Sequence, residues 1–360
     1  ADISLILLFK CVKRLTGPRG YLPCAVLALP LVAFNAWISW VYSDSLSLPV
    51  GIGLFLIWLI IKEKESARSR LLWSAAFGAL VVYGYLIKPT NIVAAAAVAA
   101  ASLYEIWRRK DKPRLRSALK SSACAILCAA LLLCVFPTVR AGMLEGVYDE
   151  RMAEEEAKPV THFIMMGMNI EGESLGEWSA KDEMETSFRL TQREKIEYNI
   201  SVIKERLAGF GPFRYVEFLL LKMRNTYMQG NLAFFGGDSQ SFYRSEANAP
   251  LFDPLAEFYF RGGSAYQTYC DISDGLWALV MLLCAASVFR KRNEEGGLET
   301  ALLALKLSLL GQAAFFMLFE TSPRYIVLFL PLFVLFCTLS FTKLPAGLKR
   351  PETQFKTREI

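Results

Sequence analysis

Several uncharged apolar runs, each close to the length that crosses a lipid bilayer, constrain this chain more than any other feature. The stretch from Ala123 to Phe136 contains no charged side chain and no strong hydrogen-bonding group. A helix needs roughly 20 mostly apolar residues to cross the hydrocarbon core of a bilayer. The composition agrees, since 54% of the 360 residues are hydrophobic. The sequence therefore predicts an all-α polytopic membrane protein.

The positions of the apolar runs predict about nine membrane-spanning helices. The first is partial, because residues 1–9 read as the last turns of a longer helix and lack the basic flank and cleavage site of a signal peptide. We therefore expect the chain to be the later part of a longer protein. The full spans are expected near 21–41, 46–61, 72–87, 92–107, 118–138, 275–290, 299–319 and 324–341.

These spans divide the chain into four regions. We expect an N-terminal set of membrane helices, a mainly helical external domain, a C-terminal set of membrane helices and a cytoplasmic tail, at residues 1–141, 142–274, 275–342 and 343–360.

Within the external domain, the run from Phe210 to Leu221 predicts an amphipathic helix that lies on the membrane surface. The run is apolar but short for a crossing, and it carries Arg214 and Glu217. A helix of this kind buries its apolar face at the boundary between headgroups and acyl chains.

The distribution of lysine and arginine predicts the orientation of the spans. One set of connections, with the tail, carries 23 basic residues, whereas the alternate short connections carry only Lys88 and Arg324. Basic residues remain on the cytoplasmic side during insertion. We therefore expect a multi-pass protein of the plasma membrane with an external large loop and a cytoplasmic C-terminus. The net charge of +6 follows from this orientation and does not indicate a nucleic-acid partner.

The cysteines and the single histidine restrict the chemistry further. Most of the eight cysteines fall inside apolar runs, and Cys270 stands alone in the external region, so no disulfide framework is expected. With His162 as its one histidine, the chain shows no Cys/His pattern typical of a metal site.

Two short external connections contain charged residues at the membrane edge, where charge is costly unless it is used or paired. Asp44, in the turn Tyr42–Ser45, could hold a metal, orient a sugar or accept a proton; alternatively, Asp44 or Ser45 caps the following helix. Lys88 presents an ammonium that suits a phosphate group. It precedes a Pro-Thr-Asn turn, and the Thr or Asn of that turn could cap the next helix. The alternative for Lys88 is an ordinary contact with lipid phosphates.

Two more clusters lie on the same side. His162 is the one residue whose unperturbed pKa lies near neutrality, and with Asn169 it could shape a pocket, although a lone histidine is more often structural. Glu320 and Arg324, with Tyr325 beside them, stand at a turn between two spans. A surface ion pair there contributes only about 0–1 kcal/mol, whereas an arginine also binds phosphate through two parallel hydrogen bonds. Together the four clusters predict one external site with anion contacts and at least two carboxylates.

These segments, in this order, resemble part of a known family. The chain is similar to the C-terminal two-thirds of bacterial membrane glycosyltransferases of the GT-C superfamily, in particular the protein-O-mannosyltransferase-like enzymes of family 39 and the aminoarabinose-transferase-like enzymes. The resemblance rests on Tyr42–Pro49, Ile87–Asn91, Thr161–Asn169, Lys222–Gly230 and Glu320–Tyr325 with the following Leu328–Pro331 run.

The resemblance implies a GT-C-like helix bundle that transfers a sugar from a polyprenyl-phosphate carrier to a protein, lipid or polymer acceptor, with inversion. It implies that the main catalytic aspartate lies in a first external loop that this chain lacks, so the chain alone is expected to be inactive. Asp44 would be a secondary acidic residue, and a divalent metal is a possible cofactor. The donor and pocket would be contacted by Lys88, His162, Asn169, Glu320, Arg324 and Tyr325.

Two other functions remain open from the sequence. A transporter or lipid flippase would carry charged residues at mid-membrane and broken helices, and Lys306 is the clear mid-span charge here. A non-catalytic scaffold for envelope assembly would need no convergent acidic and basic site.

Overall fold

A computed structural model shows a chain built almost entirely of helices. No β-strand occurs in the ranges that it describes, so the predicted all-α class is confirmed. These ranges are residues 1–40, 42–110, 112–144, 149–170, 175–234, 249–289 and 297–342.

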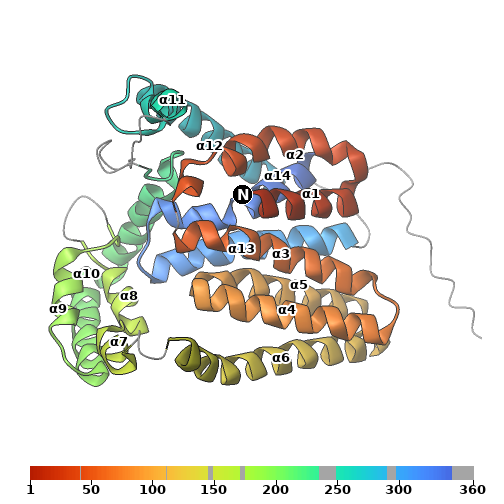
Figure 1. Ribbon diagram of the computed structural model, residues 1–360, viewed down its shortest axis with the longest axis horizontal. Helices are drawn as coiled ribbons and strands as arrows, with labels where there is room; N and C mark the ends of the chain where they lie inside the picture. Colours follow the sequence, from red (N-terminus) through yellow and green to blue (C-terminus); the bar gives the residue numbers. More distant parts are fainter. Residues whose placement is uncertain are drawn as a thin grey trace, which may run out of the picture.

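The membrane part is a bundle of long helices that lie side by side (Figure 1). Within the described ranges, seven helices are long and apolar enough to cross a membrane. They are α3 (Ser43–Glu63), α4 (Ala67–Ile87), η4 with α5 (Pro89–Asn91 and Ile92–Arg109), α6 (Lys112–Leu144), α12 (Tyr266–Phe289), α13 (Gly297–Leu318) and η7 with α14 (Pro323–Phe329 and Leu330–Phe341).

The first two predicted spans do not reach that length. The expected span at 21–41 is divided after Ala33. Pro30, which cannot donate a backbone hydrogen bond, lies in a π-helical turn that continues α2 and ends at Phe34. Asn35 then accepts a hydrogen bond from the Trp37 amide at 3.0 Å to start a new turn. The segment pairs with the N-terminal helix against the bundle. Its pieces are α1 (Asp2–Thr16), η1 (Gly17–Gly20), α2 (Tyr21–Ala28), η2 (Leu29–Ala33) and η3 (Ala36–Ser39).

The helices differ in how deeply they lie in the bundle. Most of α3 and α14 is buried, whereas α6 packs along α4 and exposes its apolar side chains. The α4–α6 contact depends on Gly78, where a Cβ atom would overlap the Ala125 carbonyl. Small residues allow such close packing of helices in membranes.

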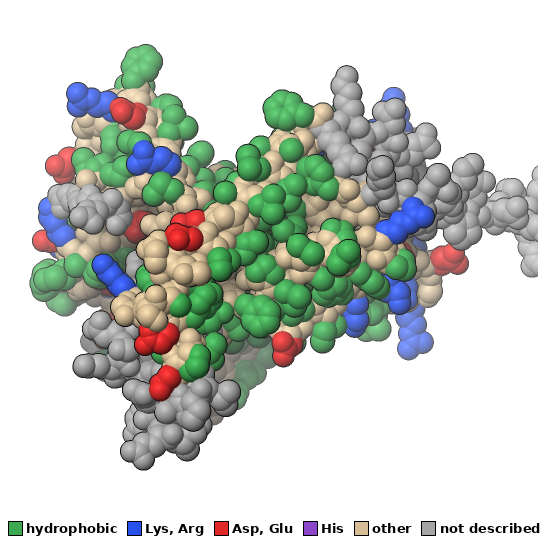
Figure 2. Space-filling view, turned by 90° about the horizontal axis from the view of Figure 1, so that it is seen from above, with side chains coloured by type: hydrophobic (Ala, Val, Ile, Leu, Met, Phe, Trp, Pro, Cys, Tyr) green, Lys and Arg blue, Asp and Glu red, His purple; other side chains and the backbone are tan. Residues whose placement is uncertain are grey.

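The two ends of the bundle carry different groups. One end, here called the basic end, has three ion pairs that join neighbouring helices, and the other, the domain end, meets helices α7 to α10 (Figure 1). Figure 2 shows apolar side chains across the middle of one face, with charged ones mainly towards the ends. The pairs at the basic end are Arg14–Glu63, Lys62–Glu105 and Arg108–Glu299.

The predicted domain between the two sets of membrane helices is helical where the structure describes it. Its boundaries differ slightly, since α6 continues to Leu144 and α12 begins at Tyr266. The expected tail, 343–360, lies outside the described residues. The domain contains α7 (Glu150–Glu156), α8 (Val160–Met166), α9 (Ala180–Ser187), α10 (Gln192–Met228) and α11 (Ala249–Tyr259).

The domain is attached to the bundle where α13 ends. The Glu320 amide donates to the Phe163 carbonyl at 2.7 Å, and the Thr321 amide donates to the Gly176 carbonyl at 2.9 Å.

The ammonium of Lys222, whose side chain is fully buried, strengthens the same joint. It donates to the Gly167 carbonyl at 2.6 Å and to the Phe319 carbonyl at 2.7 Å. Burial lowers the pKa of Lys222 to about 7. The joint therefore fixes the α13–η7 turn against the domain.

The orientation inferred from the basic residues can be tested by cysteine labelling. In a variant whose eight native cysteines are replaced, we expect an impermeant maleimide to label Ser201→Cys in intact cells and Glu65→Cys only after permeabilisation. Both positions are exposed, so accessibility does not bias the comparison. The cysteine-free protein is the control, and labelling with the opposite sidedness would overturn the predicted topology.

Candidate functional site

Asp44 and Lys88 form a buried ion pair at the domain end. Asp44 lies in the first turn of α3 and is 1% exposed, and its Oδ1 atom accepts from the ammonium of Lys88, which follows α4. Of the two capping residues considered, Ser45 makes the capping contact, because its Oγ atom accepts the Tyr42 amide at 3.3 Å, whereas Asp44 is engaged with Lys88. The pair thus joins α3 to the α4–α5 turn.

Asn91 reinforces this junction instead of capping α5 with its side chain. Its amide group donates to Ser47 Oγ on α3 and to the Gly84 carbonyl on α4, each at 3.0 Å. The expectation that Thr90 or Asn91 caps α5 through its side chain is therefore wrong. Both side chains instead lie buried beside the Asp44–Lys88 pair.

Arg324 lies against two tyrosine rings at the start of η7. Its guanidinium carbon is 4.8 Å from the centre of the Tyr42 ring and 5.3 Å from that of Tyr325. Glu320 does not pair directly with Arg324 in the described contacts, because its Oε1 atom accepts the Tyr325 hydroxyl at 2.8 Å.

Lys88 connects the two groups of residues. Its ammonium lies 3.8 Å from the centre of the Tyr325 ring while it binds Asp44. Five of the seven predicted site residues therefore come together at one place. We call this set the Asp44–Arg324 cluster; it consists of Asp44, Lys88, Glu320, Arg324 and Tyr325.

Burial changes the acid–base properties of the cluster. It lowers the pKa of Lys88, and the neighbouring Asp44 carboxylate opposes that shift. It raises the pKa of Glu320, against the effect of the Tyr325 hydrogen bond and of Arg324. The Lys88 ammonium and the Glu320 carboxylate are thus both poorly solvated, so a further hydrogen-bond or charge partner would stabilise either of them strongly.

Several buried polar atoms of this region have no hydrogen-bond partner among the described residues. Buried polar groups are nearly always paired, so each exception calls for an explanation. Two of these atoms, Asp44 Oδ2 and Asn91 Oδ1, can only accept a hydrogen bond, whereas Arg324 Nε can only donate one. The Thr90 hydroxyl can do either.

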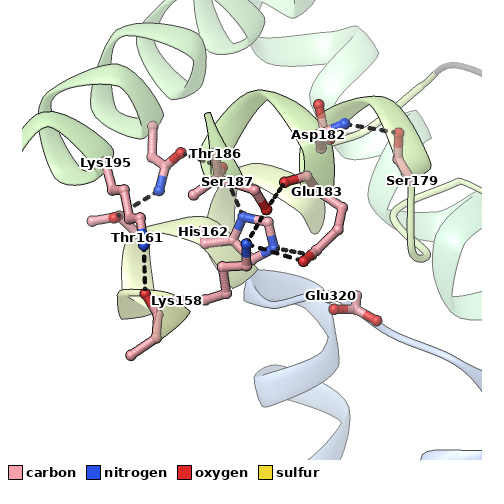
Figure 3. Close-up of polar contacts among 12 residues, drawn as sticks. Lys158, Thr161, His162, Ser179, Asp182, Glu183, Thr186, Ser187, Lys195 and Glu320 are labelled. Atoms are coloured by element: carbon pink, nitrogen blue, oxygen red, sulfur yellow. Dashed lines mark hydrogen bonds and ion pairs between the residues drawn. The ribbon is translucent and has the colours of Figure 1, made fainter. Parts of the chain in front are cut away.

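His162 lies in the domain, in a second network (Figure 3). Its Nδ1 atom is 2.9 Å from Thr186 Oγ1, and its Nε2 atom is 3.1 Å from Glu183 Oε2. Glu183 also binds Lys158 at 3.1 Å. Burial lowers the pKa of His162, partly opposed by the Glu183 carboxylate.

Glu183 is the residue through which this network approaches the Asp44–Arg324 cluster. The negative charge of Glu183 contributes to the raised pKa of Glu320. In Figure 3, Glu320 reaches towards the domain from the bundle, on the side of His162 where Glu183 lies. Asn169 is buried in the domain, where its carbonyl accepts the Gly176 amide at 2.8 Å. His162 and Asn169 thus lie in the domain wall beside the cluster.

Two residues near the site were not singled out from the sequence. Glu183 belongs to a polar helical stretch that is rich in acidic residues, so its sequence context does not distinguish it. Lys222 offers a signal, since it is a lysine directly after the apolar run Phe218–Leu221. In the described residues, no three His, Cys, Asp or Glu side chains come together as a metal site.

The buried ion pair leads to a stability prediction. We expect Lys88→Met to lower the free energy of unfolding by about 3–5 kcal/mol, because it leaves the Asp44 carboxylate buried without a counter-charge. The double variant Asp44→Asn/Lys88→Met should recover much of that loss. Unfolding in mixed micelles by titration with dodecyl sulfate measures both effects.

The control for this comparison is Arg108→Met, which breaks the exposed pair with Glu299 at the basic end. A surface pair of this kind contributes about 0–1 kcal/mol. Equal losses for Lys88→Met and Arg108→Met would show that the Asp44–Lys88 pair is effectively solvated.

A pH dependence follows from His162. Because its pKa in the folded domain lies below the usual 6.5, the unfolded state binds more protons as the pH falls below 6.5, and the domain loses stability. We expect hydrogen exchange of α8 and α9, corrected for the intrinsic pH effect, to accelerate from pH 7 to pH 5.5. In His162→Gln this acceleration should disappear, and its persistence would assign the pH effect to other groups.

Comparison with known proteins places this architecture in a family. A family model described as conserved hypothetical integral membrane protein matches residues 3–344, which include both the bundle and the domain. No curated protein and no solved structure matches the chain. The multi-pass membrane character therefore rests on the family as well as on the seven long apolar helices, while the similarity to GT-C glycosyltransferases stays a prediction. The chain belongs to the family of conserved hypothetical integral membrane proteins.

Proposed function

We propose that this protein takes part in glycosyl transfer from a polyprenyl-phosphate carrier to a cell-envelope acceptor, at the domain end of the bundle on the external face. The observation that supports this function is the Asp44–Arg324 cluster. It combines cations suited to a phosphate with oxygen atoms suited to sugar hydroxyls, where the membrane helices end.

Arg324 and Lys88 form the phosphate-binding side of the proposed site. Two tyrosine rings lie beside the guanidinium of Arg324, so cation–π contacts hold its position while Nε has no partner among the described residues. A planar guanidinium held in this way can bind a phosphate through two parallel hydrogen bonds. Lys88 adds a second positive charge through the shared Tyr325 ring.

The acceptor atoms on the other side suit a ligand that donates hydrogen bonds. Asp44 Oδ2 and Asn91 Oδ1 are buried acceptors without a partner among the described residues, and the Thr90 hydroxyl lies in the same turn as Asn91. Sugar hydroxyls would supply the missing donors. Entry of a ligand requires movement of nearby side chains, and Tyr42, which lies against Arg324, is 39% exposed.

The proposed reaction is a single displacement. An acceptor hydroxyl attacks the anomeric carbon, the bond from that carbon to the phosphate oxygen breaks, and polyprenyl phosphate leaves with the electron pair. A carboxylate removes the hydroxyl proton, a contribution of typically 10²–10⁴-fold. Arg324 and Lys88 would stabilise the charge that develops on the leaving phosphate.

A lipid flippase is the main alternative, and the position of the charges separates it from a transferase. Among the described residues, the ion pairs that join the membrane helices lie at the ends of the bundle. Transport sites lie near the middle of the bilayer. Lys306, which the sequence places in the middle of a span, lies on the exposed surface of α13 and not inside the bundle.

The proposal is tested with the whole natural protein in proteoliposomes. A set of undecaprenyl-phosphate hexoses and pentoses with radiolabelled sugars is offered together with envelope fractions as acceptors. Transfer of label to an acceptor supports the proposal. Movement of the lipid between leaflets without transfer would favour a flippase, and neither activity would favour a scaffold.

Arg324 gives the sharpest prediction about the site. We expect Arg324→Ala to reduce donor affinity or turnover by roughly 10- to 150-fold, because a hydrogen bond to a charged group contributes about 1.5–3 kcal/mol. Arg324→Lys should recover only part of this loss, since lysine keeps the charge but not the planar pair of donors. Binding of labelled undecaprenyl phosphate and the rate of sugar transfer measure the effect.

Arg189→Ala is the matched control, since Arg189 also stacks on a tyrosine, at 3.8 Å from the centre of the Tyr198 ring, but lies in the domain. It should bind donor normally. Glu320→Ala is scored alongside for expression. If Arg324→Ala and Glu320→Ala lose expression equally and the surviving protein transfers sugar normally, the η7 turn is structural and the phosphate assignment is wrong.

A further inference from the structure

Helix α10 consists of two halves with different surroundings. The break is at Gly211, whose φ of 63° and ψ of 170° are not helical, and Pro212 begins the second half. A positive φ is readily adopted only by glycine, and proline is well suited to the first turn of a helix. The sequence therefore specifies a change of direction at this point.

The first half of α10 runs beside α8 towards the bundle. Asn199 Nδ2 lies 3.3 Å from Thr161 Oγ1, and further along Arg206 donates to the Met165 carbonyl at 2.6 Å. Since α8 ends next to the joint with α13, the break at Gly211 lies near the level at which the membrane helices end.

The second half of α10 is held at that level. Lys222 donates to the carbonyl of Phe319, directly after α13, and Thr226 Oγ1 is 3.0 Å from Thr321 Oγ1. The indole of Trp277, on α12, donates to the Tyr227 carbonyl at 2.7 Å. Three contacts thus fix this half to the ends of two predicted spans.

The second half of α10 has three distinct faces. One face is buried in the protein and consists of Phe218, Lys222 and Thr226. The exposed polar side chains are Arg214, Glu217 and Arg224. Between these two faces, by the periodicity of 3.6 residues per turn, lies an exposed apolar stripe made of Phe213 at 89%, Val216 at 56% and Leu220 at 64% exposure.

We infer that this apolar stripe lies in the headgroup region of the bilayer, with phospholipid as its partner. The order of the faces around the helix is the one that an interfacial helix requires: protein on one flank, acyl chains below and water above. The tether to the end of α13 and to Trp277, in the middle of α12, places the stripe beside the membrane helices, and the arginines of the polar face complement lipid phosphates.

The same contacts connect the membrane surface to the Asp44–Arg324 cluster. Thr321, which contacts α10, lies between Glu320 and Arg324 in the α13–η7 turn. The lipid-bound helix therefore fixes the height of that turn relative to the headgroups. This inference does not depend on the proposed transferase activity.

Photo-crosslinking tests the inference directly. The protein with Phe213→benzoylphenylalanine is reconstituted in vesicles of phosphatidylethanolamine and phosphatidylglycerol, irradiated, and searched by mass spectrometry for phospholipid adducts on this residue. We expect adducts at a yield within about threefold of the same substitution at Leu310, which is 68% exposed on the span α13.

Leu190 supplies the matched negative control. It is 78% exposed and apolar, but it precedes α10, and about 21 Å of helix runs from Gln192 to Arg206, so the first half of α10 separates it from the stripe. Leu190→benzoylphenylalanine should give at least about tenfold fewer lipid adducts than Phe213. Equal yields at Phe213 and Leu190, or crosslinks from Phe213 to a second copy of the chain, would overturn the inference.

Discussion

The attachment of the domain to the end of α13 is the interaction on which the rest of this structure depends. Lys222 contributes a buried ammonium that binds carbonyl groups of both parts, and two backbone hydrogen bonds to Glu320 and Thr321 lie beside it. The carbonyls at the end of a helix attract a cation, so the lysine compensates groups that α13 leaves unpaired. Without this joint, the turn that carries Arg324 would have no fixed relation to the domain.

The Asp44–Arg324 cluster shows how a membrane protein holds charge at the boundary of the lipid. Asp44 is buried, and a single neighbouring ammonium balances it. Aromatic rings take the place of further counter-charges, because Tyr325 lies close to both Lys88 and Arg324. An arginine flanked by rings stays oriented and retains donors for a ligand, which a fully paired arginine would not.

Much of this could be predicted from the sequence, because the bilayer imposes a simple length rule on apolar runs. The helical class, most span positions and the gathering of Asp44, Lys88 and Arg324 at one end followed from such runs and from the charges between them. The division of the segment 21–41 was not predicted, because hydropathy does not register the end of the helix at Phe34, after the π-helical turn that contains Pro30. The choice between capping and pairing for Asp44 also could not be made, since it depends on which helix lies alongside α3. Glu183 was missed for the same reason: its neighbours come from other segments.

The joint also has a consequence for how the family can diverge. Most of its hydrogen bonds involve backbone atoms, so the identity of Phe163, Phe319 or Thr321 can change without removing them. The constraint falls instead on Gly167 and Gly176, where a Cβ atom would overlap the Phe319 backbone and the Lys222 side chain, respectively. Relatives that keep this arrangement should therefore vary widely around the joint while retaining two glycines nine residues apart and one lysine well after them as its signature.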